Sequence, residues 1–504
     1  MSPPPAPKVL TSLPRQEWAS AKARLATFSP KNAENLLVID SALFVVALDD
    51  DKPREDTSVS DSYGTNSDQD GHRPIDDIAA NMLHGSYRLN KEDVQIGTCC
   101  NRWYDKLMLI VMPGGTAGVN FEHSAIDGHT ALRFVSDIYA ETIVNFAQGI
   151  TKSIHGEGLI PHVVDAAVRR ASIVVKDGEK SGRTPDTNPK KLLFDIPTSV
   201  QRQIFFAETA LGDEIVGSDT VVLEFQLFGK LLLVGNRLSP DSVVQVMLLC
   251  AYFCLYGQTV CAYEPVLTKQ FYHGRTEAMR TATPEAAEFC RVWNDSDVPA
   301  IDKIAALRKA TTEHSRLVKE AAQGKGVDRH LFALQCIAER HRKGASMPAF
   351  FECSAWKKLN HTVLSTSNCG NPSLRLFGFG PVVRDGFGVG YIIKDNALSF
   401  SIASKHRQTK RFMGTLEKVL CELGEILVEG DTIQVSGDRR AGSITQEAPS
   451  TSPKLVAEPD AYSDIWGESA TVPETKPRFT RTFSFVRRGQ SLSADRLSQT
   501  GDNL

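Results

Sequence analysis

Apolar residues recur with two different spacings along the chain, and these spacings predict both strands and helices. Lys106–Met112 and Thr116–Phe121 are short apolar runs, and Pro113-Gly114-Gly115 between them is typical of a turn that joins two strands. From Leu132 to Phe146, apolar residues are spaced by one, three and four positions, which predicts an amphipathic helix. Strand, turn, strand and helix therefore follow one another in this part of the chain.

The same reading predicts a mixture of helices and strands over the rest of the chain up to about residue 430. Gly324 and Gly344 each follow a predicted helix, in the position where glycine commonly ends one. Pro14–Leu48 is expected to form a helix followed by a strand, and the strand is placed at Leu36–Leu48. The further expected elements are a strand at Val221–Phe228, helices at Pro240–Tyr256, Asp302–Gln323 and Asp328–Arg342, a strand-turn-strand unit at Phe377–Tyr391, and an amphipathic helix from Phe412 to Leu427.

Polar stretches separate these elements. Asp49–Arg73 is acidic and rich in serine and glycine, and it is predicted to be a surface loop, as is Lys176–Lys191. Beyond about Gly430 aliphatic residues become scarce, which predicts a disordered tail. In this tail, Arg478–Arg488 interleaves phenylalanine with arginine, and Ser491 follows in a context that suits a basophilic kinase. Chance clustering of charge in a disordered segment explains the same pattern.

Composition excludes several classes of function. The chain has 504 residues, 41% hydrophobic and 23% charged, which is typical of a soluble protein with two or three domains. A net charge of -3 gives no general attraction for nucleic acid. The most apolar segment, Ser242–Tyr256, is shorter than the roughly 20 residues that a membrane-spanning helix needs. We therefore expect a soluble monomer without a transmembrane segment.

Cysteine usage and the chain ends indicate the compartment. The ten cysteines are scattered, which is typical of a reducing compartment rather than of a disulfide framework. Cys99-Cys100 has no companion pair at zinc spacing, so we expect no metal site and no permanently bound cofactor. Met1–Pro5 is not a signal peptide and Asp502–Leu504 is not a peroxisomal signal, which favours the cytoplasm. Mitochondria or peroxisomes are the alternatives if the true N-terminus is missing.

The sharpest chemical signal is a histidine placed directly after a predicted strand. His123 follows Thr116–Phe121, and Asp127-Gly128 comes four residues later. A histidine generally titrates near neutral pH, so it can remove the proton of an alcohol and make it a nucleophile. Asp127 can orient such a histidine or support the loop around it. The alternative for this short motif on its own is an ordinary histidine in a loop.

Further motifs give this histidine a context. Together they resemble the carnitine and choline acyltransferase family, in family order and over about residues 8 to 430. The matching segments are Leu10-Thr11-Ser12 with Trp18-Ala19, Asn101–Lys106, Phe121–Ser124, Phe228-Gly229-Lys230, Leu238–Asp241, Tyr263-Glu264, Phe271–Glu277, Asp328–Leu331, Leu364–Ser367, and Phe379–Val383 with Asp385-Gly386.

The resemblance implies the roles of the catalytic and carnitine-binding residues. His123 would be the general base, and Ser367 would stabilise the oxyanion of the tetrahedral intermediate. The carboxylate of carnitine would be held by Arg329 and Thr276, and arginine suits this task because its planar fork pairs with a carboxylate. Choline has no carboxylate, and the choline-specific branch lacks this pair, which favours carnitine. Taken alone, Arg329 is better explained as a surface ion-pair residue. Two further residues would assist at the carnitine site, namely Tyr263 and Ser365.

Coenzyme A or acetyl-CoA would be bound as a substrate. Lys230 resembles the family's lysine for the 3′-phosphate, and Asp241 resembles the residue near the adenine end. The chain departs from the family at Val234, where a second lysine is usual, so Arg237 is the next cation. It also departs at Asn368, which replaces a glutamine in the coenzyme A site. Weaker coenzyme A binding follows from these differences.

Acyl length is indicated by one position. Phe377 lies where short-chain members carry a bulky residue that closes the acyl pocket and where longer-chain members carry glycine. Its ring would fill the space that a long chain needs. We expect acyl groups from acetyl to about butyryl.

The family fold gives the expected architecture. It is an α/β fold of two similar halves, each a two-layer mixed-sheet sandwich of the chloramphenicol-acetyltransferase-like, CoA-dependent type, with the histidine in the channel between them. Residues 1–200 would be the remainder of the first half, 201–430 the second half with the coenzyme A and carnitine motifs, and 431–504 the disordered tail. The opening Pro7–Ser12 resembles the middle of the first half, so this half would be incomplete.

Two functions follow from these observations. The first is a working carnitine O-acetyltransferase, with carnitine and acyl-CoA as its small-molecule partners. The second is a catalytically impaired family member that binds coenzyme A or a partner. The intact His123, Ser367, Thr276 and Arg329 favour the first function, whereas the incomplete first half and Val234 favour the second.

Overall fold

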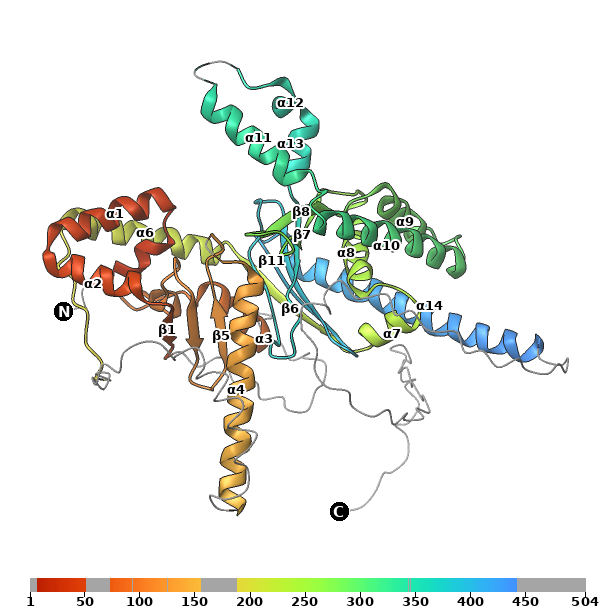
Figure 1. The fold of residues 1–504 in the computed structure, drawn as a ribbon, viewed down its shortest axis with the longest axis horizontal. Coiled ribbons are helices and arrows are strands. Elements are labelled where there is room, and N and C mark those ends of the chain that lie inside the picture. The colour runs from red at the N-terminus through yellow and green to blue at the C-terminus, as the bar shows by residue number, and fades with distance from the viewer. Residues whose placement is uncertain are drawn as a thin grey trace, which may run out of the picture. The chain divides into compact units, whose positions relative to one another are not determined.

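Two larger β-sheets organise the chain in the computed structural model, which describes residues 7–50, 73–92, 94–124, 126–155, 188–342, 344 and 346–441 (Figure 1). One is a three-stranded sheet of order β1-β4-β5, and the other is a six-stranded sheet of order β6-β11-β10-β9-β7-β8. Both sheets contain parallel and antiparallel pairs. The α/β class with mixed sheets is therefore confirmed. No helix in the described part of the chain combines the length and the apolar character that a membrane span requires.

The N-terminal elements surround the smaller sheet. The predicted strand pair is confirmed as β4 and β5, and the helix after it is confirmed as α4. The elements are η1 (Pro7–Ser12), α1 (Arg15–Phe28), α2 (Pro30–Ser41), β1 (Val45–Leu48), α3 (Pro74–His84), β2 (Arg88–Leu89), β3 (Gln95–Ile96), η2 (Thr98–Asn101), β4 (Met108–Val111), β5 (Ala117–Asn120), α4 (Gly128–His155) and α6 (Thr198–Val216).

The predicted strand at Leu36–Leu48 is wrong in its first half. Residues up to Ser41 belong to helix α2, and only Val45–Leu48 forms a strand. Pro30 stands at the first helical position, where its fixed φ and missing N–H favour a helix start. Leu36 is buried on the inner side of this helix, so its apolar side chain served a helix rather than a strand.

Helix α6 packs with the N-terminal elements. Val200, Ile204, Ala207 and Leu211 share one apolar cluster with η1, α1 and α2. The spacing of three and four residues places these four side chains on a single face of α6. The core of the N-terminal elements therefore includes α6, and the core of the C-terminal elements begins after this helix ends, near Gly217.

The C-terminal elements build the larger sheet. Helices α8 and α14 share an apolar core with strands β6, β9, β10 and β11. The predicted helices at Pro240–Tyr256, Asp302–Gln323 and Asp328–Arg342 are confirmed as α8, α10 and α11. The elements are β6 (Asp219–Phe225), α7 (Lys230–Gly235), α8 (Pro240–Tyr256), β7 (Ala262–Leu267), β8 (Thr276–Arg280), α9 (Pro284–Asn294), α10 (Ala300–Ala322), α11 (Asp328–His341), α12 (Ala349–Glu352), α13 (Ser354–Asn360), β9 (Leu364–Asn368), β10 (Phe387–Ile393), β11 (Leu398–Ser404) and α14 (Thr409–Ala441).

Two predictions in this part need correction. The unit expected at Phe377–Tyr391 has only its second strand, β10, because the first segment contains Gly378, Gly380 and Pro381 and runs without a sheet partner. The last helix, α14, continues to Ala441, past the boundary predicted near Gly430. Residues 442–504, with the predicted tail motifs, lie outside the described residues, as do residues 51–72 and 176–187 of the two predicted loops.

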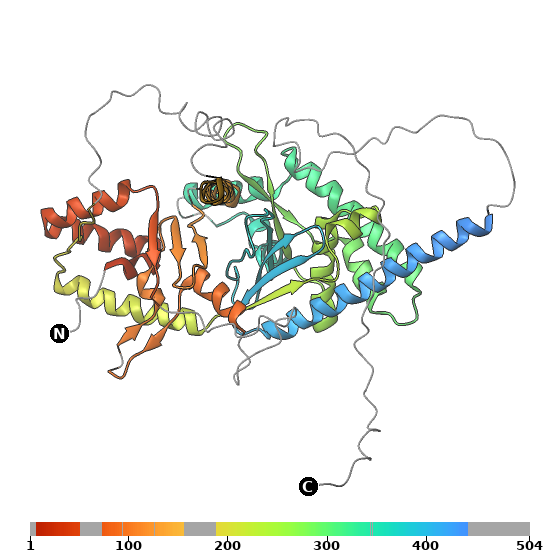
Figure 2. The same ribbon diagram turned by 90° about the horizontal axis from the view of Figure 1, so that it is seen from below.

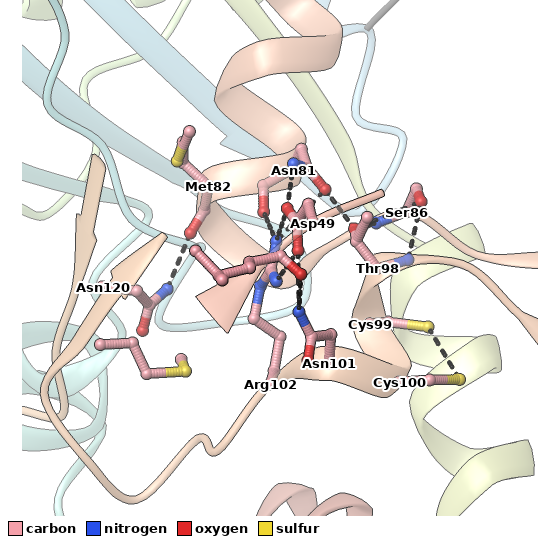
Figure 3. Close-up of polar contacts among 12 residues, drawn as sticks. Asp49, Asn81, Met82, Ser86, Thr98, Cys99, Cys100, Asn101, Arg102 and Asn120 are labelled. Atoms are coloured by element: carbon pink, nitrogen blue, oxygen red, sulfur yellow. Dashed lines mark hydrogen bonds and ion pairs between the residues drawn. The ribbon is translucent and has the colours of Figure 1, made fainter. Parts of the chain in front are cut away.

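A buried ion pair fastens the smaller sheet to the elements around it (Figure 3). Arg102 Nη1 and Nη2 donate to the two carboxylate oxygens of Asp49 at 2.7 and 2.9 Å, and neither side chain is exposed. Asp49 directly follows β1, and Asn81 of α3 donates to the same carboxylate at 3.1 Å. Burial alone would raise the pKa of Asp49, but the hydrogen bonds and the charge of Arg102 outweigh it and hold this pKa below its usual value.

Removal of one partner of this pair should be far more destabilising than removal of an exposed pair. Arg102→Ala leaves the Asp49 carboxylate buried without its counter-charge, so the free energy of unfolding should fall by about 3–5 kcal/mol. The control is Arg133→Ala, which breaks an exposed pair with Asp137 on α4 and should lower it by less than about 1 kcal/mol. Urea unfolding followed by circular dichroism measures both, and equal losses would contradict the expected role of Arg102.

Candidate active site

His123 lies on the short connection between β5 and α4. Asn120, the last residue of β5, donates from Nδ2 to the carbonyl oxygens of Met82 and Leu83 in α3, both at 2.9 Å, and so fixes the point where the strand ends. The His123 side chain is 63% exposed, whereas the Asp127 side chain, just before α4, is only 9% exposed. The loop therefore presents its imidazole and buries its acid.

Arg275 holds this loop from the larger sheet. It lies directly before β8, and its Nε and Nη2 donate to Oδ1 of Asp127 at 2.9 and 2.7 Å. The same guanidinium donates to the backbone carbonyls of Ser124 at 3.1 Å and His123 at 2.9 Å. Sequence reasoning gave Arg275 no role, although it lies inside the matched segment Phe271–Glu277 and next to Thr276. A cation beside a predicted anion-binding residue was the available signal.

The imidazole of His123 has two neighbours at its Nδ1 atom. Asp127 Oδ1 lies at 3.7 Å and Arg275 Nη2 at 3.5 Å, both at or beyond the limit of an ordinary hydrogen bond. Either ring nitrogen is therefore open to act as the base. An approach of Asp127 Oδ1 to Nδ1–H would leave the lone pair of Nε2 available to a substrate hydroxyl.

The residues predicted to bind carnitine gather around one end of β8. Thr276 begins this strand, and Nε of Arg329, at the start of α11, lies 3.5 Å from the Thr276 carbonyl oxygen. The predicted proximity of these two residues, 53 positions apart in sequence, is thereby confirmed. Asp328 is buried and accepts from Arg280 Nε at 2.9 Å, which anchors the start of α11 while Arg329 stays exposed.

Tyr263 and Ser365 lie beside each other in the same sheet. They are paired residues of the parallel strands β7 and β9. The Tyr263 hydroxyl is close enough to Arg329 for its charge to act on it, although burial is the larger effect and raises the pKa of Tyr263. The sheet thus places Tyr263 next to Arg329 on one side and Ser365 on the other.

Ser367 and Phe377 are brought together by two glycines. Ser365 and Ser367 of β9 pair with Gly388 and Gly390 of β10. A Cβ atom at Gly390 would lie 2.2 Å from the carbonyl oxygen of Phe377, and one at Gly388 would lie 2.5 Å from that of Phe379. Glycine is therefore required at both places, because the backbone of 377–380 lies directly against β10. This packing sets Phe377 one strand away from Ser367.

The residues predicted to bind coenzyme A fall into two groups. Lys230 begins α7 and Arg237 follows this helix with a positive φ of 57°, and both are exposed. Arg308 of α10, which sequence reasoning missed, donates from Nη1 to the Asn236 carbonyl at 2.9 Å and adds a cation beside them. In the second group, Asn368 Nδ2 donates to Asp241 Oδ1 at 3.0 Å.

Asp241 also belongs to a buried polar network. Its Oδ1 accepts from the Tyr391 hydroxyl at 2.7 Å. Glu264 and His314 lie within the same group, with Glu264 Oε2 2.8 Å from His314 Nε2, and His314 Nδ1 lies 2.9 Å from Ser242 Oγ. Burial raises the pKa of Glu264 well above its usual value, with the charge of Asp241 adding to it, and burial lowers the pKa of His314. Both shifts favour the neutral forms of the two side chains.

These three side chains form the one cluster of possible metal ligands among the described residues. Ligand atoms of Asp241, Glu264 and His314 lie within 4.8 Å of one another. Each is already engaged: both nitrogens of His314 have hydrogen-bond partners, and Glu264 Oε2 is one of them. Hydrogen bonding among these side chains explains the cluster. In the sequence, the sign of a buried polar network was Gln245, an isolated polar residue in the apolar run of α8, which donates to the Tyr391 hydroxyl.

A family model described as Choline/Carnitine o-acyltransferase matches residues 3–418. The chain belongs to this family. The resemblance inferred from the ordered motifs is thus confirmed, and the histidine loop, the β8–α11 site and the serines of β9 all lie within the matched residues of this acyltransferase family member.

Similar proteins differ in their named acyl group. A protein of Saccharomyces cerevisiae named "Putative mitochondrial carnitine O-acetyltransferase" is 39% identical over 429 residues, which are 83% of this chain and 59% of that protein. The mitochondrial carnitine O-palmitoyltransferase 2 of Homo sapiens is 31% identical over 434 residues, 84% of this chain and 56% of that protein. The chain thus spans a little more than half the length of these curated relatives.

Similarity to solved structures is low. The wax ester synthase/diacylglycerol acyltransferase from Marinobacter aquaeolei VT8 aligns over 70% of this chain and 76% of that chain, with a TM-score of 0.32 and 12% identity. Nothing about the site follows from a likeness at this level.

The raised pKa of Glu264 predicts a dependence of stability on pH. Unfolded Glu264 loses its proton above about pH 4.5 while the folded side chain keeps it to higher pH, so wild-type stability falls as pH rises above about 4.5. Glu264→Gln retains a donor to His314 and cannot ionise. The free energy of unfolding of the variant relative to wild type should therefore increase with pH, by up to about 1.4 kcal/mol per pH unit.

Urea unfolding at pH 5 to 8 measures this difference. Glu313→Gln is the control, because Glu313 lies next to His314 on α10, is not buried, and has its pKa lowered chiefly by hydrogen bonds from Arg316. Its difference from wild type should stay constant above about pH 5.5. The same flat profile for Glu264→Gln would show that Glu264 is ionised in the folded protein.

Proposed function

We propose that the protein transfers a short acyl group reversibly between coenzyme A and the hydroxyl of L-carnitine. The observation that carries the proposal is the junction at Arg275. This residue bonds the loop of His123 and is followed at once by Thr276, which lies against Arg329. A candidate base and a candidate carboxylate-binding pair are therefore linked through two adjacent residues, Arg275 and Thr276, as a hydroxy acid substrate requires.

The proposed reaction assigns one step to each group. His123 removes the proton of the carnitine hydroxyl as its oxygen attacks the thioester carbonyl. Ser367 donates a hydrogen bond to the oxyanion that forms. The C–S bond then breaks, and the coenzyme A thiolate recovers the proton from the imidazolium of His123. Asp127, held by Arg275, supports the loop and the positive charge that His123 carries between these two proton transfers.

Substrate binding is assigned to three groups of residues. Arg329 and Thr276, with Tyr263 and Ser365 beside them, would bind carnitine through its carboxylate. Lys230 and Arg237 would bind the phosphates of coenzyme A. Arg308 would supply the positive charge that is absent at Val234, where a lysine is usual in the family. Asp241 and Asn368 would stabilise the coenzyme A site mainly through hydrogen bonds inside the protein rather than through contacts with coenzyme A, because Asp241 already accepts two hydrogen bonds.

Acetyl or another short group is the proposed acyl substrate. Phe377 is half-buried, and its backbone lies directly against Gly390, so the main chain that carries the ring cannot move toward β10. The named relatives include both an acetyltransferase and a palmitoyltransferase, so the family as a whole spans both acyl lengths. The bulk at this position supports the short end of that range.

A reducing compartment suits the protein. All ten cysteines are free, including the buried Cys99, Cys250 and Cys290. We place the chain in the cytoplasm, with the mitochondrion as the alternative, since the yeast relative carries a mitochondrial name.

Activity of the purified chain tests the proposal directly. Transfer from acetyl-CoA to carnitine should be detectable as free thiol release, and it should be faster with acetyl- and butyryl-CoA than with palmitoyl-CoA. His123→Ala should lower the rate by about 10²–10⁴-fold because the general base is lost. The fold should remain intact, since this side chain is largely exposed, and circular dichroism checks this.

Two outcomes would overturn the assignment. A variant within a few-fold of wild type would exclude His123 as the base. A chain that binds coenzyme A but shows no transfer with any acyl group would support the non-catalytic alternative, for which the unmatched part of the relatives gives a physical reason.

The choice of alcohol is tested at Arg329. Arg329→Asn removes a charge-assisted contact worth roughly 1.5–3 kcal/mol, so the KM for carnitine should rise by about ten- to a hundredfold. The KM for acetyl-CoA should stay within about twofold. Arg340→Asn, an exposed arginine on the last turn of the same helix, is the control and should change neither constant. A rise in the acetyl-CoA constant alone would assign Arg329 to the other substrate.

A further inference from the structure

Two adjacent thiols lie side by side in the short helix η2. The Sγ atoms of Cys99 and Cys100 are 4.0 Å apart (Figure 3). Cys99 is buried and packs with Ile204 and Leu211 of α6, the helix that runs along the N-terminal elements in Figure 2. Cys100 is half-buried, so the pair can be reached from solvent through its thiol.

The backbone around this pair is closely packed. A Cβ atom at Gly85 would lie 2.5 Å from the backbone nitrogen of Cys99, and one at Gly97 would lie 2.4 Å from the carbonyl oxygen of Ser86. Cys99 also donates its backbone N–H to the Ser86 carbonyl oxygen at 3.1 Å. The sulfur atoms can therefore change their separation by side-chain rotation, while the main chain is held in place.

A disulfide fits this geometry poorly. Its sulfur atoms are about 2.05 Å apart and its Cα atoms usually at least about 4.4 Å apart, whereas adjacent Cα atoms are separated by about 3.8 Å. A bond between these neighbours therefore needs a change of backbone, which the packing at Gly85 and Gly97 resists. A metal ion in line between two thiolates needs about 4.6 Å, for two bonds of about 2.3 Å each, and less where the bonds bend. The observed separation is close to this second value.

Polar groups around the pair favour thiolates. Gln95 donates from Nε2 to Sγ of Cys99 at 3.4 Å. The hydrogen bond from Cys100 lowers the pKa of Cys99 against the effect of burial, and the charge of Arg102 acts in the same direction. Burial lowers the pKa of the half-buried Lys8, whereas a negative charge at Cys100 raises it. A thiolate at this pair and the ammonium of Lys8 therefore stabilise each other.

We propose that Cys99 and Cys100 bind a soft monovalent metal ion, copper(I), with Lys8 supplying the counter-charge. Thiolates are the ligands that copper(I) prefers, and two of them can hold it. Binding releases the thiol protons to solvent, and the resulting unit carries one negative charge, which the Lys8 ammonium balances. The inference does not depend on the proposed acyl transfer.

Zinc fits the pair less well. The sequence alone predicted no metal site here, because Cys99-Cys100 has no companion pair at zinc spacing. Protein sites for zinc almost always have four ligands. Among the residues that the structure describes, the pair does not belong to a group of three or more candidate ligands, unlike the cluster at His314. A two-thiol site therefore selects an ion that accepts a low coordination number.

A second pair of cysteines provides an internal comparison. The Sγ atoms of Cys250 and Cys254 in α8 are also 4.0 Å apart. Cys250 lies in the apolar core, and burial raises its pKa. Among the charges that act on Cys254, the effect of Glu422 is larger than that of Lys418, whose side chain is exposed. This pair has the same sulfur separation without the favourable charges, so it should bind copper(I) more weakly.

Competition for copper(I) tests the site. The reduced chain is titrated without oxygen in the presence of bathocuproine disulfonate, whose absorbance reports the copper(I) that the protein does not hold. The wild type should hold one tightly bound copper(I) per chain. Cys100→Ser should lower the affinity at least about a hundredfold, because a hydroxyl is a hard ligand, and Lys8→Met should lower it about tenfold. Cys254→Ser is the matched control and should stay within about twofold of the wild type.

Each outcome is decisive. Circular dichroism checks that the variants are folded, and Lys8→Met keeps both thiols, so it remains informative if Cys100→Ser fails to fold. A wild-type chain that loses all copper(I) to the chelator would overturn the proposal, as would unchanged affinity in the Cys100 or Lys8 variant. A larger loss in Cys254→Ser would assign the metal to α8 instead. A chain that has lost two hydrogen atoms by mass and binds no copper would show a disulfide, and would also overturn the proposal.

Discussion

The contact on which the candidate site depends is the one between Arg275 and the loop that carries His123. Its guanidinium reaches one carboxylate and two backbone carbonyls of that loop, so it fixes main chain as well as side chain. The loop belongs to the smaller sheet and Arg275 to the larger one, and each sheet is stabilised by its own core. The candidate base is therefore positioned by a contact between two separately packed sheets, and a second contact between them is made by Asp76 of α3, which accepts from the backbone N–H of Val222 in β6 at 2.7 Å.

Sequence patterns were most reliable where the reason for a pattern was local. Helix α8 begins and ends at the predicted residues, because Pro240 and Gly257 fix both boundaries chemically. Leu36 was misread because a single apolar residue fits a strand and a helix equally well. The proximity of Arg329 and Thr276 followed from ordered family motifs, not from spacing. Arg275, Arg308 and the Glu264–His314 pair were missed because each acts through a partner distant in sequence, and such pairings depend on tertiary structure.

The buried polar network shows how a core beside a candidate binding site can hold ionisable groups. Glu264 and His314 are hydrogen-bonded to each other, and Ser242 extends the chain of hydrogen bonds. Asp241 stays half-buried at the edge and is held by Tyr391 and Asn368. The network connects helix α8 to strands β7, β9 and β10 through directional bonds, which fix the relative position of these elements more narrowly than apolar packing does.

The two glycines of β10 have a consequence for how such a site can diversify. Backbone lies on backbone at Gly388 and Gly390, so the height of the 377–380 segment above Ser365 and Ser367 is set by main-chain radii and does not depend on which side chains the segment carries. If Phe377 closes the acyl pocket as proposed, a substitution at this residue would change the depth of that pocket while Ser365 and Ser367 keep their positions. Selection on acyl length would then act on one codon without disturbing the groups proposed for the chemistry.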